Sequence, residues 1–363
     1  MADPSSAGFP WAISNGCSNA QRAVIRKVET VVAEDCGGKA RIVIIQGPTA
    51  SGKSELAIRL AEQLDGEIIN ADSMQVYRGM DIGTAKPSPA MQQRVPHHLI
   101  DIVDPDVNFT AADFQRRASE AIDSIQRRGK HPIVVGGTGL YIRALLNGLM
   151  ESPAGDEEYR RELKALAAQA GNEAVHRLLL AVDPATAAML HPNDLVRVMR
   201  ALEVFRQTGR PISELRQEHG FSGDHYRALK LGIRVERQEL YRRIEQRVDR
   251  MMEDGLEHEV RQLLAAGFHA DLKAMRAIGY RQICAYLAGS VPLEEAIALI
   301  KQETRHYAKR QDTWFKRDAE ISWVDYQKSF ASIVNYVIDF LSKGVCYGKS
   351  TIQHPGSVSE PVP

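Results

Sequence analysis

Residues 41–54 read RIVIIQGPTASGKS, and this stretch decides the fold. Its first part, 41–46, is a short apolar run of the kind that forms a buried strand. Its second part fits the pattern GxxxxGK[ST] with Gly47, Pro48, Thr49, Ala50, Ser51, Gly52, Lys53 and Ser54. A helical stretch over residues 55–64 follows at once. A strand, a glycine-rich loop and a helix in this order predict a P-loop that binds the phosphates of a ligand.

The chemistry of this loop follows from its residue types. Glycines let backbone N–H groups close around phosphate oxygens at the positive end of the following helix. Lys53 is expected to neutralise the terminal phosphates, and the Ser54 hydroxyl to ligate a Mg²⁺ ion that bridges them. The pattern therefore predicts a diphosphate or triphosphate ligand, and it leaves open which phosphorylated molecule binds.

Beyond the loop, short apolar runs alternate with helical stretches, as in a parallel sheet covered by crossover helices. Strands are predicted over 67–71 (EIINA), 132–135 (PIVV) and 229–235 (LKLGIRV), and a helix over 111–128 with Thr110 as its N-cap. Helix formers dominate over 156–217, 237–266, 279–288 and 293–317. We therefore predict an α/β fold, with a P-loop NTPase-like parallel sheet core flanked by helices and an inserted all-helical domain.

The predicted domain organisation has a leader, a divided core, an insertion and a tail. The segments are a flexible leader over 1–39, core over 40–149, a helical insertion over 150–225, core completion over 226–343 and a disordered tail over 344–363. The leader is basic and rich in Ser, which is typical of an organelle-targeting segment; a leader without function is the alternative. The first interpretation implies a plastid or a mitochondrion, and the second the cytoplasm.

Composition argues against several classes of protein. No uninterrupted apolar run reaches the ~18 residues of a membrane span, so no membrane role is expected. Lys plus Arg equals Asp plus Glu at 46 each, so net charge argues neither for nor against an anionic partner such as a nucleic acid. Cys17, Cys36, Cys284 and Cys346 show no CxxC spacing, which argues against a disulfide framework or a zinc site. The adjacent His97 and His98 point in different directions, so we interpret them as structural.

Asp72 is the first candidate for catalysis. It follows the strand over 67–71, and we expect that strand to neighbour the P-loop strand and to point Asp72 into the crevice. A carboxylate there can take a proton from an incoming nucleophile. The alternative is that Asp72 caps the following turn or holds Mg²⁺ through water.

Two further loops carry polar groups. The loop over 81–87 (DIGTAKP) offers the Thr84 hydroxyl and the Lys86 ammonium to a substrate, or is only a solvated connection. The loop over 136–139 (GGTG) ends the third strand and carries Thr138. Thr138 is a crevice residue and also a candidate N-cap for the helix that follows, and the two roles are compatible.

Several helices present basic residues at helical spacing. Arg197 and Arg200 share a helix face, as do Arg243 and Arg247, and ion pairs with nearby glutamates are the alternative to a ligand contact. The last predicted helix carries a basic and aromatic set: Lys301, Arg305, Tyr307, Lys309, Arg310, Trp314, Phe315, Lys316 and Arg317. Such a face suits an RNA backbone and unstacked bases, although a charged helix docked on a core has a similar composition.

A series of motifs carries a resemblance to a known family: GPTASGKS, NADSMQVYRGMDIGTAKP, PHHLIDIVDP, VVGGTGLY, HPNDLVRVMRALEVF and AIGYRQ. Over residues 40–325 the sequence resembles the tRNA dimethylallyltransferases, also called tRNA isopentenyltransferases. The resemblance implies that dimethylallyl diphosphate, rather than ATP, occupies the P-loop. It also implies transfer of the dimethylallyl group to the exocyclic amine of the adenosine 3′-adjacent to the anticodon in tRNA, which gives isopentenyladenosine.

The resemblance also implies roles for residues. Asp72 is implied to be the general base. The other implied catalytic residues are Lys53, Ser54, Thr138 and Arg247. Mg²⁺ is the implied cofactor, and it offsets negative charge on the departing diphosphate. The implied tRNA contacts are Asp72, Ser73, Met74, Gln75, Thr138, Arg160, Val196, Arg197, Val198, Met199, Arg200, Arg276, Gly279, Tyr280, Arg281, Arg305, Lys309 and Arg310. Cytosolic eukaryotic relatives often carry a C-terminal zinc finger, which this sequence lacks, so it looks more like bacterial or organellar forms. We expect a monomer that binds the anticodon stem-loop.

Three other functions are alternatives to prenyl transfer to tRNA: two enzymes with different substrates and one protein without catalysis. An enzyme that prenylates free adenine nucleotides, as in cytokinin synthesis, would not need the helical insertion or the basic last helix, so their presence favours tRNA. A small-molecule kinase would use the same P-loop on ATP. A nucleic-acid-binding module would have no catalysis, and Asp72 would then serve binding.

Overall fold

The computed structural model describes residues 39–150, 153–220, 223 and 225–343. The predicted tail, and all but the last residue of the predicted leader, lie outside this part. The described residues form a parallel sheet of six strands: β1 (Arg41–Gln46), β2 (Gly66–Asn70), β3 (His97–His98), β4 (His131–Gly136), β5 (Arg227–Ile233) and β6 (Ser322–Val324). The strand order is β3-β2-β4-β1-β5-β6. The predicted P-loop-like α/β fold is confirmed.

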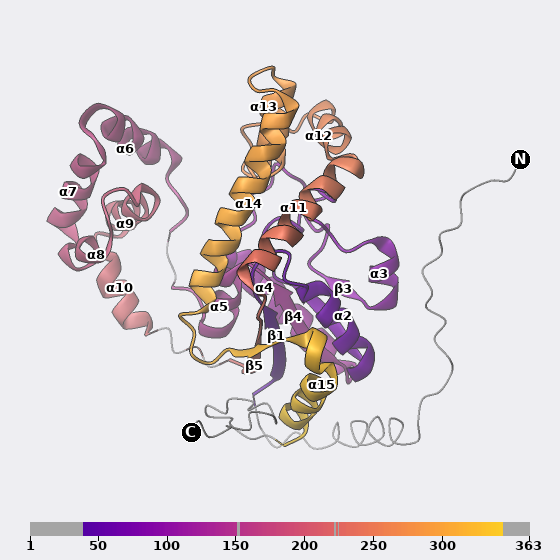
Figure 1. Cartoon of the computed structure of the whole chain (residues 1–363). Helices are drawn as coiled ribbons and strands as arrows, with labels where there is room; N and C mark the ends of the chain where they lie inside the picture. Colours follow the sequence, from indigo (N-terminus) through magenta and orange to yellow (C-terminus); the bar gives the residue numbers. More distant parts are fainter. Residues whose placement is uncertain (1–38, 151–152, 221–222, 224, 344–363) are drawn as a thin grey trace, which may run out of the picture.

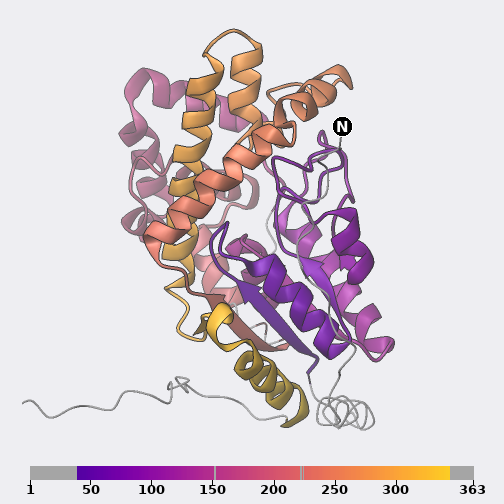
Figure 2. The same cartoon turned by 45° about the vertical axis from the view of Figure 1, so that its right-hand side comes forward.

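Helices cover both faces of the sheet (Figure 1). Side chains alternate along β1, so Ile42 and Ile44 join the core on one face, and Val43 and Ile45 the core on the other. The first core contains residues of α4 (Ala111–Arg127), α5 (Gly139–Asn147), α11 (Arg237–Glu253), α12 (Leu256–Ala265), α13 (Tyr280–Leu287) and α14 (Leu293–Phe315). The second contains residues of α2 (Lys53–Leu64) and α15 (Tyr326–Lys343), and α3 (Pro89–Arg94) packs against α2. In Figure 2 the orange helices stand above the sheet and α15, in yellow, lies below it.

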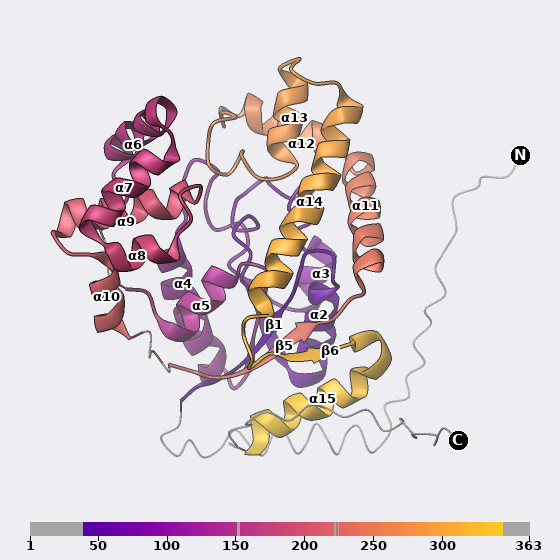
Figure 3. The ribbon, with the colours of Figure 1, turned by 60° about the vertical axis from the view of Figure 1, so that its left-hand side comes forward.

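Five helices form a separate cluster beside the sheet (Figures 1 and 3). They are α6 (Glu157–Ala170), α7 (Asn172–Val182), α8 (Pro184–Met189), α9 (Leu195–Thr208) and α10 (Ile212–His219). They share a core of their own, which includes Leu163, Val175, Leu179, Val198 and Leu202. The bounds of the domains stay a prediction. No helix in the described ranges is both long and apolar enough to cross a membrane.

The structure corrects the expected place of the strand before Asp72. β4 lies between β1 and β2, so that strand does not neighbour the P-loop strand. β4 takes the central place because it is apolar on both faces, with Ile133 and Val134 fully buried in opposite cores. The carboxyl ends of β1, β4 and β2 nevertheless open at one edge of the sheet, where open parallel sheets bind their ligands.

Other elements differ from the sequence prediction in detail. The helix expected over 237–266 is broken at Gly255, whose φ of 98° starts α12 as a new helix. The strands β3 and β6 were not expected, because two or three residues are too few to show an alternating pattern. The helix α15 was also missed, although Phe330, Ile333, Val337 and Phe340 recur at helical spacing.

His97 and His98 have structural roles, as interpreted from the sequence. His97 Nδ1 lies 2.7 Å from the carbonyl oxygen of Val95, and His98 Nε2 lies 2.7 Å from Glu67 Oε2. Glu67 also accepts a hydrogen bond of 2.6 Å from Arg128, so this buried carboxylate of β2 ties β3 to the end of α4. Burial alone would raise the pKa of Glu67, but the hydrogen bonds from His98 and Arg128 outweigh it and lower the pKa below 4.5.

We predict that Glu67→Gln changes how stability depends on pH. A carboxylate whose folded-state pKa is lowered stabilises the fold above its unfolded pKa, and this contribution is lost as the pH falls through the folded pKa. Urea unfolding at pH 7 should show a loss of about 1–3 kcal/mol in the variant. Below pH 4.5 the wild type should lose stability more steeply than the variant. Parallel pH profiles would contradict the assignment, and Glu120→Gln, at an exposed ion pair, is the control.

Candidate active site

The P-loop turns sharply from β1 into α2. Ala50 has a φ of 62° and Gly52 a φ of 95°, so the backbone is in the left-handed region at both residues. Such a conformation is unfavourable for Ala, and residues held this way concentrate at functional sites. The turn presents the first backbone N–H groups of α2, which begins at Lys53, to the edge of the sheet. These groups have no partner within the helix, so they suit an anion.

The charge of Lys53 is influenced by one cation, Arg247, and one carboxylate, Asp72. Its Nζ donates to the carbonyl oxygen of Pro48 at 2.8 Å. Desolvation and the charge of Arg247 lower the pKa of Lys53 to about 8, although the carboxylate of Asp72 partly offsets them. Asp72 likewise favours the charged form of Arg247, whose pKa burial lowers. Two cations and one carboxylate therefore lie within electrostatic reach of one another, and an entering anion would favour the protonated form of Lys53.

Asp72 and Thr138 are linked by a hydrogen bond between Thr138 and Ser73, the residue that follows Asp72 after β2. Asp72 Oδ1 accepts from the backbone N–H of Met74 at 2.8 Å, which is the turn cap considered from the sequence. Its charge also reaches Lys53 and Arg247, so the cap does not remove Asp72 from the crevice. Thr138 occupies the N-cap position of α5, but its side chain makes no capping bond there. Its Oγ1 accepts instead from Ser73 N at 3.1 Å, which fastens the 136–139 loop to the segment after β2.

The helix α14 contacts two of the loops that form the site. Gln311, which is buried, accepts from the backbone N–H of Thr49 at 2.8 Å and donates to the carbonyl oxygen of Gly137 at 2.9 Å. One amide side chain therefore links the P-loop to the loop after β4. Burial together with the charge of Asp72 raises the pKa of Tyr307, and the nearby side chains of Thr138 and Gln311 offset part of this rise. Tyr307 stays protonated at neutral pH beside the proposed base.

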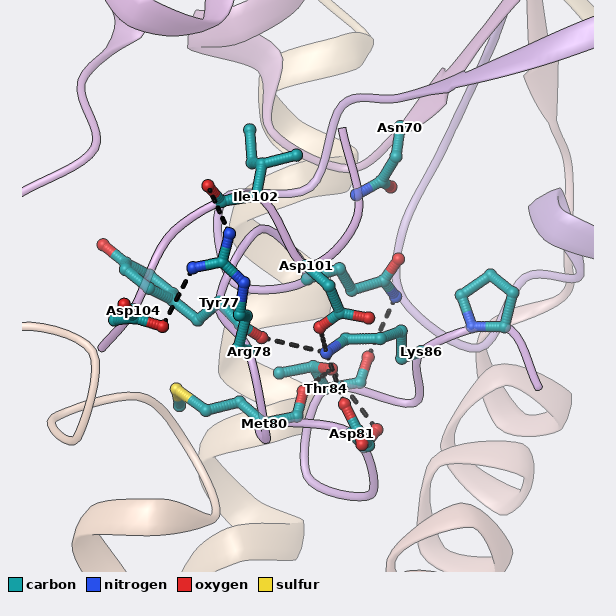
Figure 4. Close-up of polar contacts among 12 residues, drawn as sticks. Asn70, Tyr77, Arg78, Met80, Asp81, Thr84, Lys86, Asp101, Ile102 and Asp104 are labelled. Carbon is teal, nitrogen blue, oxygen red and sulfur yellow. Dashed lines mark hydrogen bonds and ion pairs between the residues drawn. The ribbon is translucent and has the colours of Figure 1, made fainter. Parts of the chain in front are cut away.

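The loop over 81–87 is fastened by its own polar groups (Figure 4). The side chain of Lys86 is 4% exposed, pairs with Asp81 and Asp101, and donates to the carbonyl oxygen of Tyr77 at 2.9 Å. The Thr84 hydroxyl donates to Met80 O at 2.7 Å. The structure thus agrees with neither sequence alternative in full: both groups are bonded to other protein groups, and the loop is not a solvated connection. Both groups hold the loop in shape.

The predicted tRNA contacts on α9 divide into exposed and buried residues. Val196 is 76% exposed and the side chain of Arg197 is 69% exposed, although Arg197 pairs with Asp194. Val198 and Met199 are buried in the core of the helical cluster, so their side chains do not reach its surface. Arg160 and Arg200 both pair with the buried Glu203, and for Arg200 this is the ion-pair alternative considered from the sequence.

The predicted tRNA contacts on α13, on α14 and in the loop before α13 also divide into exposed and buried residues. Gly279 and Tyr280 are buried, whereas Arg276 is exposed. Arg281 pairs with Glu303, and Arg305 pairs with Glu245 at 2.8 Å. The side chains that line a hollow on α14 are His306, Lys309, Arg310, Thr313, Trp314 and Arg317. This hollow is basic, and Trp314 is 43% exposed within it, so cationic and aromatic surface lie together there.

Some residues of the site were missed in the sequence. Lys273 was one of them: partial desolvation of this otherwise exposed side chain and the charge of Arg160 lower its pKa, so Arg160 of α6 lies within electrostatic reach of the loop before α13. Nothing local distinguishes Lys273 in the sequence. Glu259 did carry a signal, because it is an acidic residue on the same helix face as the buried Leu256 and Leu263.

Comparisons with known proteins agree with one another. The family model described as IPP transferase matches residues 75–318. The tRNA dimethylallyltransferase 2 of Geotalea uraniireducens is 66% identical over 304 residues, which are 84% of this chain and 98% of that protein. The tRNA dimethylallyltransferase of Geobacter metallireducens is 64% identical over 83% of this chain and 98% of that protein.

Solved structures give the same result. The full-length tRNA isopentenylpyrophosphate transferase of Bacillus halodurans superposes with a TM-score of 0.62 at 44% identity, over 84% of this chain and 99% of that one. A eukaryotic dimethylallyltransferase acting on tRNA superposes with a TM-score of 0.71 at 29% identity, over 84% of this chain and 80% of that one. The fold and the loop after β1 define a P-loop-like α/β protein. Within that class, the chain belongs to the IPP transferase family.

We predict that Gln311→Leu loosens the P-loop. The substitution keeps the size of the side chain but leaves the N–H of Thr49 and the carbonyl of Gly137 without this partner. The free energy of unfolding should fall by about 1–3 kcal/mol, and inorganic pyrophosphate should bind more weakly. Gln302→Leu, at an exposed position of the same helix, is the matched control. Equal pyrophosphate affinity in wild type and Gln311→Leu, measured by calorimetry, would contradict the proposed bridge.

Proposed function

We propose that this protein transfers a dimethylallyl group from dimethylallyl diphosphate to the exocyclic amine of the adenosine 3′-adjacent to the anticodon in tRNA. Family membership and the names of the relatives support this activity. The observation that carries the proposal is the meeting of Lys53, Arg247 and Asp72 at one edge of the sheet. Two cations suit a diphosphate, and a carboxylate beside them suits a nucleophile that must lose a proton.

The diphosphate end of the donor is proposed to bind the P-loop. Backbone N–H groups at the start of α2 would hold its oxygens, with Lys53 on one side and Arg247 on the other. As the bond between the first allyl carbon and oxygen breaks, its electron pair leaves with the diphosphate. The negative charge of the leaving group then grows, and the two cations stabilise it without moving. The P-loop thus holds a leaving group rather than a phosphoryl donor.

The acceptor end of the reaction is proposed to lie at Asp72. The exocyclic nitrogen of the adenine attacks the first allyl carbon with its lone pair, a new C–N bond forms, and the nitrogen becomes positively charged. The carboxylate of Asp72 takes the excess proton and restores a neutral secondary amine. Thr138 and Tyr307 stand next to this carboxylate, so they are placed to orient an adenine against it.

The donor set of the site fits Mg²⁺. This ion prefers oxygen ligands and usually keeps only one or two from the protein when it binds phosphates. Ser54 offers an exposed hydroxyl in the first turn of α2, next to the proposed diphosphate site. Bound there, Mg²⁺ would offset negative charge on the diphosphate.

The tRNA is proposed to bind between the helical cluster and α14. The basic hollow around Trp314 suits an RNA backbone with an unstacked base, because such RNA is bound by cations and aromatic rings together. Arg160 of the helical cluster lies within electrostatic reach of Lys273 in the loop before α13, so cationic side chains of the cluster and of the core are near each other there. The adenine would leave the stack of the anticodon loop to reach Asp72.

The test is transfer of labelled dimethylallyl diphosphate by purified protein, in parallel on unmodified tRNA and on free AMP, ADP and ATP. We predict label in tRNA, and a fall of about a hundredfold to ten-thousandfold in Asp72→Asn because the amide cannot take the proton. Asp104→Asn, at an exposed ion pair with Arg78, should transfer normally.

Other outcomes would contradict the proposal in distinct ways. Label in free nucleotides alone would keep the chemistry but change the substrate to that of a cytokinin-forming enzyme. Turnover of ATP without a prenyl donor would indicate a kinase. Loss of tRNA binding in Asp72→Asn, with normal transfer at saturating tRNA, would assign Asp72 to binding.

A further inference from the structure

Glu259 is a buried carboxylate with an unusual set of partners. Its Oε2 accepts from the backbone N–H groups of Asp81 at 2.9 Å and Ile82 at 2.7 Å. Its Oε1 accepts from the N–H of Gly83 at 3.2 Å and from the hydroxyl of Tyr280 at 2.6 Å. Glu259 lies on α12 and is 7% exposed, so this carboxylate holds three successive amides of a distant loop inside the protein.

The loop that Glu259 holds faces the active site with its other side. The carbonyl oxygen of Thr84 accepts from Arg247 Nη2 at 3.3 Å and from Gln75 Nε2 at 3.0 Å. Gln75 Nε2 also lies 3.2 Å from the carbonyl oxygen of Ala85, whose φ of 47° turns the chain at this point. The loop therefore supplies fixed acceptors to a proposed diphosphate ligand, Arg247, and to a proposed tRNA contact, Gln75.

The ring of Tyr280 packs against the backbone of the same loop at Gly83. A Cβ added to Gly83 would lie 2.5 Å from the Tyr280 ring, so the backbone of the loop rests directly on that ring. Burial and the charge of Glu259 raise the pKa of the Tyr280 hydroxyl well above its ordinary value, so it remains a donor to Glu259. The Tyr280 hydroxyl is therefore used inside the protein, because the side chain is fully buried.

We propose that Glu259 is a positioning residue for Arg247, acting through the loop over 81–86. The inference rests on the proposed function, because it assigns Arg247 to the diphosphate. The bonds from three successive backbone amides to Glu259 hold the loop backbone in one conformation. This conformation places the carbonyl oxygen of Thr84, which accepts a hydrogen bond from the guanidinium of Arg247 and so orients it. Neither Glu259 nor Tyr280 touches the substrate in this account.

The proposal requires a carboxylate at this position. Both oxygens of Glu259 receive two donors each, so all its hydrogen bonds are accepted. An amide replaces one oxygen by a donor, and that donor would face either two backbone N–H groups or an N–H and a hydroxyl. Glu259→Gln should therefore release one side of the loop while the shape of the side chain is kept. Glu257→Gln is the matched control, because Glu257 lies on the same helix and pairs with Arg261 on the surface.

The first measurement is the affinity for inorganic pyrophosphate with Mg²⁺, by calorimetry on folded full-length protein. Glu259→Gln should bind pyrophosphate about tenfold more weakly, the equivalent of one lost hydrogen bond to a charged group, with Glu257→Gln unchanged. In the transfer assay its KM for dimethylallyl diphosphate should rise. Tyr280→Phe, which removes one of the four donors, should show a smaller change of the same kind.

A double-mutant cycle separates positioning from general loosening of the fold. If Glu259 acts through Arg247, then Glu259→Gln should weaken pyrophosphate binding little further in an Arg247→Ala background. Full additivity of the two effects, or unchanged affinity in Glu259→Gln, would overturn the inference. A wild-type protein that does not bind pyrophosphate would instead overturn the proposed function, so the two failures are distinct.

Discussion

The close approach of β2 to β4 at their carboxyl ends is the constraint on which the rest of the site depends. Gly136 ends β4 without a side chain, and a Cβ there would lie 2.1 Å from the carbonyl oxygen of Ala71. The N–H of Thr138 reaches that same carbonyl at 3.3 Å. Because the two strand ends meet so closely, Asp72 and Thr138 emerge together, although they are far apart in the sequence.

A second long-range constraint brings the P-loop to this point. β4 separates β1 from β2, so the loop after β1 would stand apart from Asp72 without a further link. Gln311 provides the link, since one buried amide bonds both the P-loop and the loop after β4. The same helix carries Tyr307 toward Asp72 and the hollow around Trp314 toward solvent. A single helix, α14, thus joins the proposed chemical site to the proposed RNA surface.

The sequence predicted the parts of this arrangement that local patterns encode. Residues 41–46 were predicted as a strand and form β1 with the same bounds, because a buried central strand is a continuous apolar run. The N-cap at Thr110 was also predictable, since Thr and Asp at this spacing form a capping box. The P-loop pattern likewise gave the loop and the start of α2.

What the sequence did not predict depends on contacts between distant residues. The place of β4 is decided by packing on both faces of the sheet, and no local pattern states a strand order. Lys86 and Tyr280 stand in motifs that suggest ligand contact, but the structure turns both side chains inward, to Asp101 and to Glu259. Polar residues of a motif can thus hold a loop in shape, and only the fold distinguishes such residues from those that face a ligand.

The most direct test of the account is a crystal structure with Mg²⁺ and a non-reactive analogue of dimethylallyl diphosphate, in which sulfur replaces the oxygen that joins the allyl group to the diphosphate. The account predicts that the diphosphate lies within hydrogen-bond distance of the P-loop amides, with Lys53 and Arg247 beside it and the first allyl carbon directed toward Asp72. A diphosphate bound elsewhere, or an allyl carbon directed away from Asp72, would contradict it.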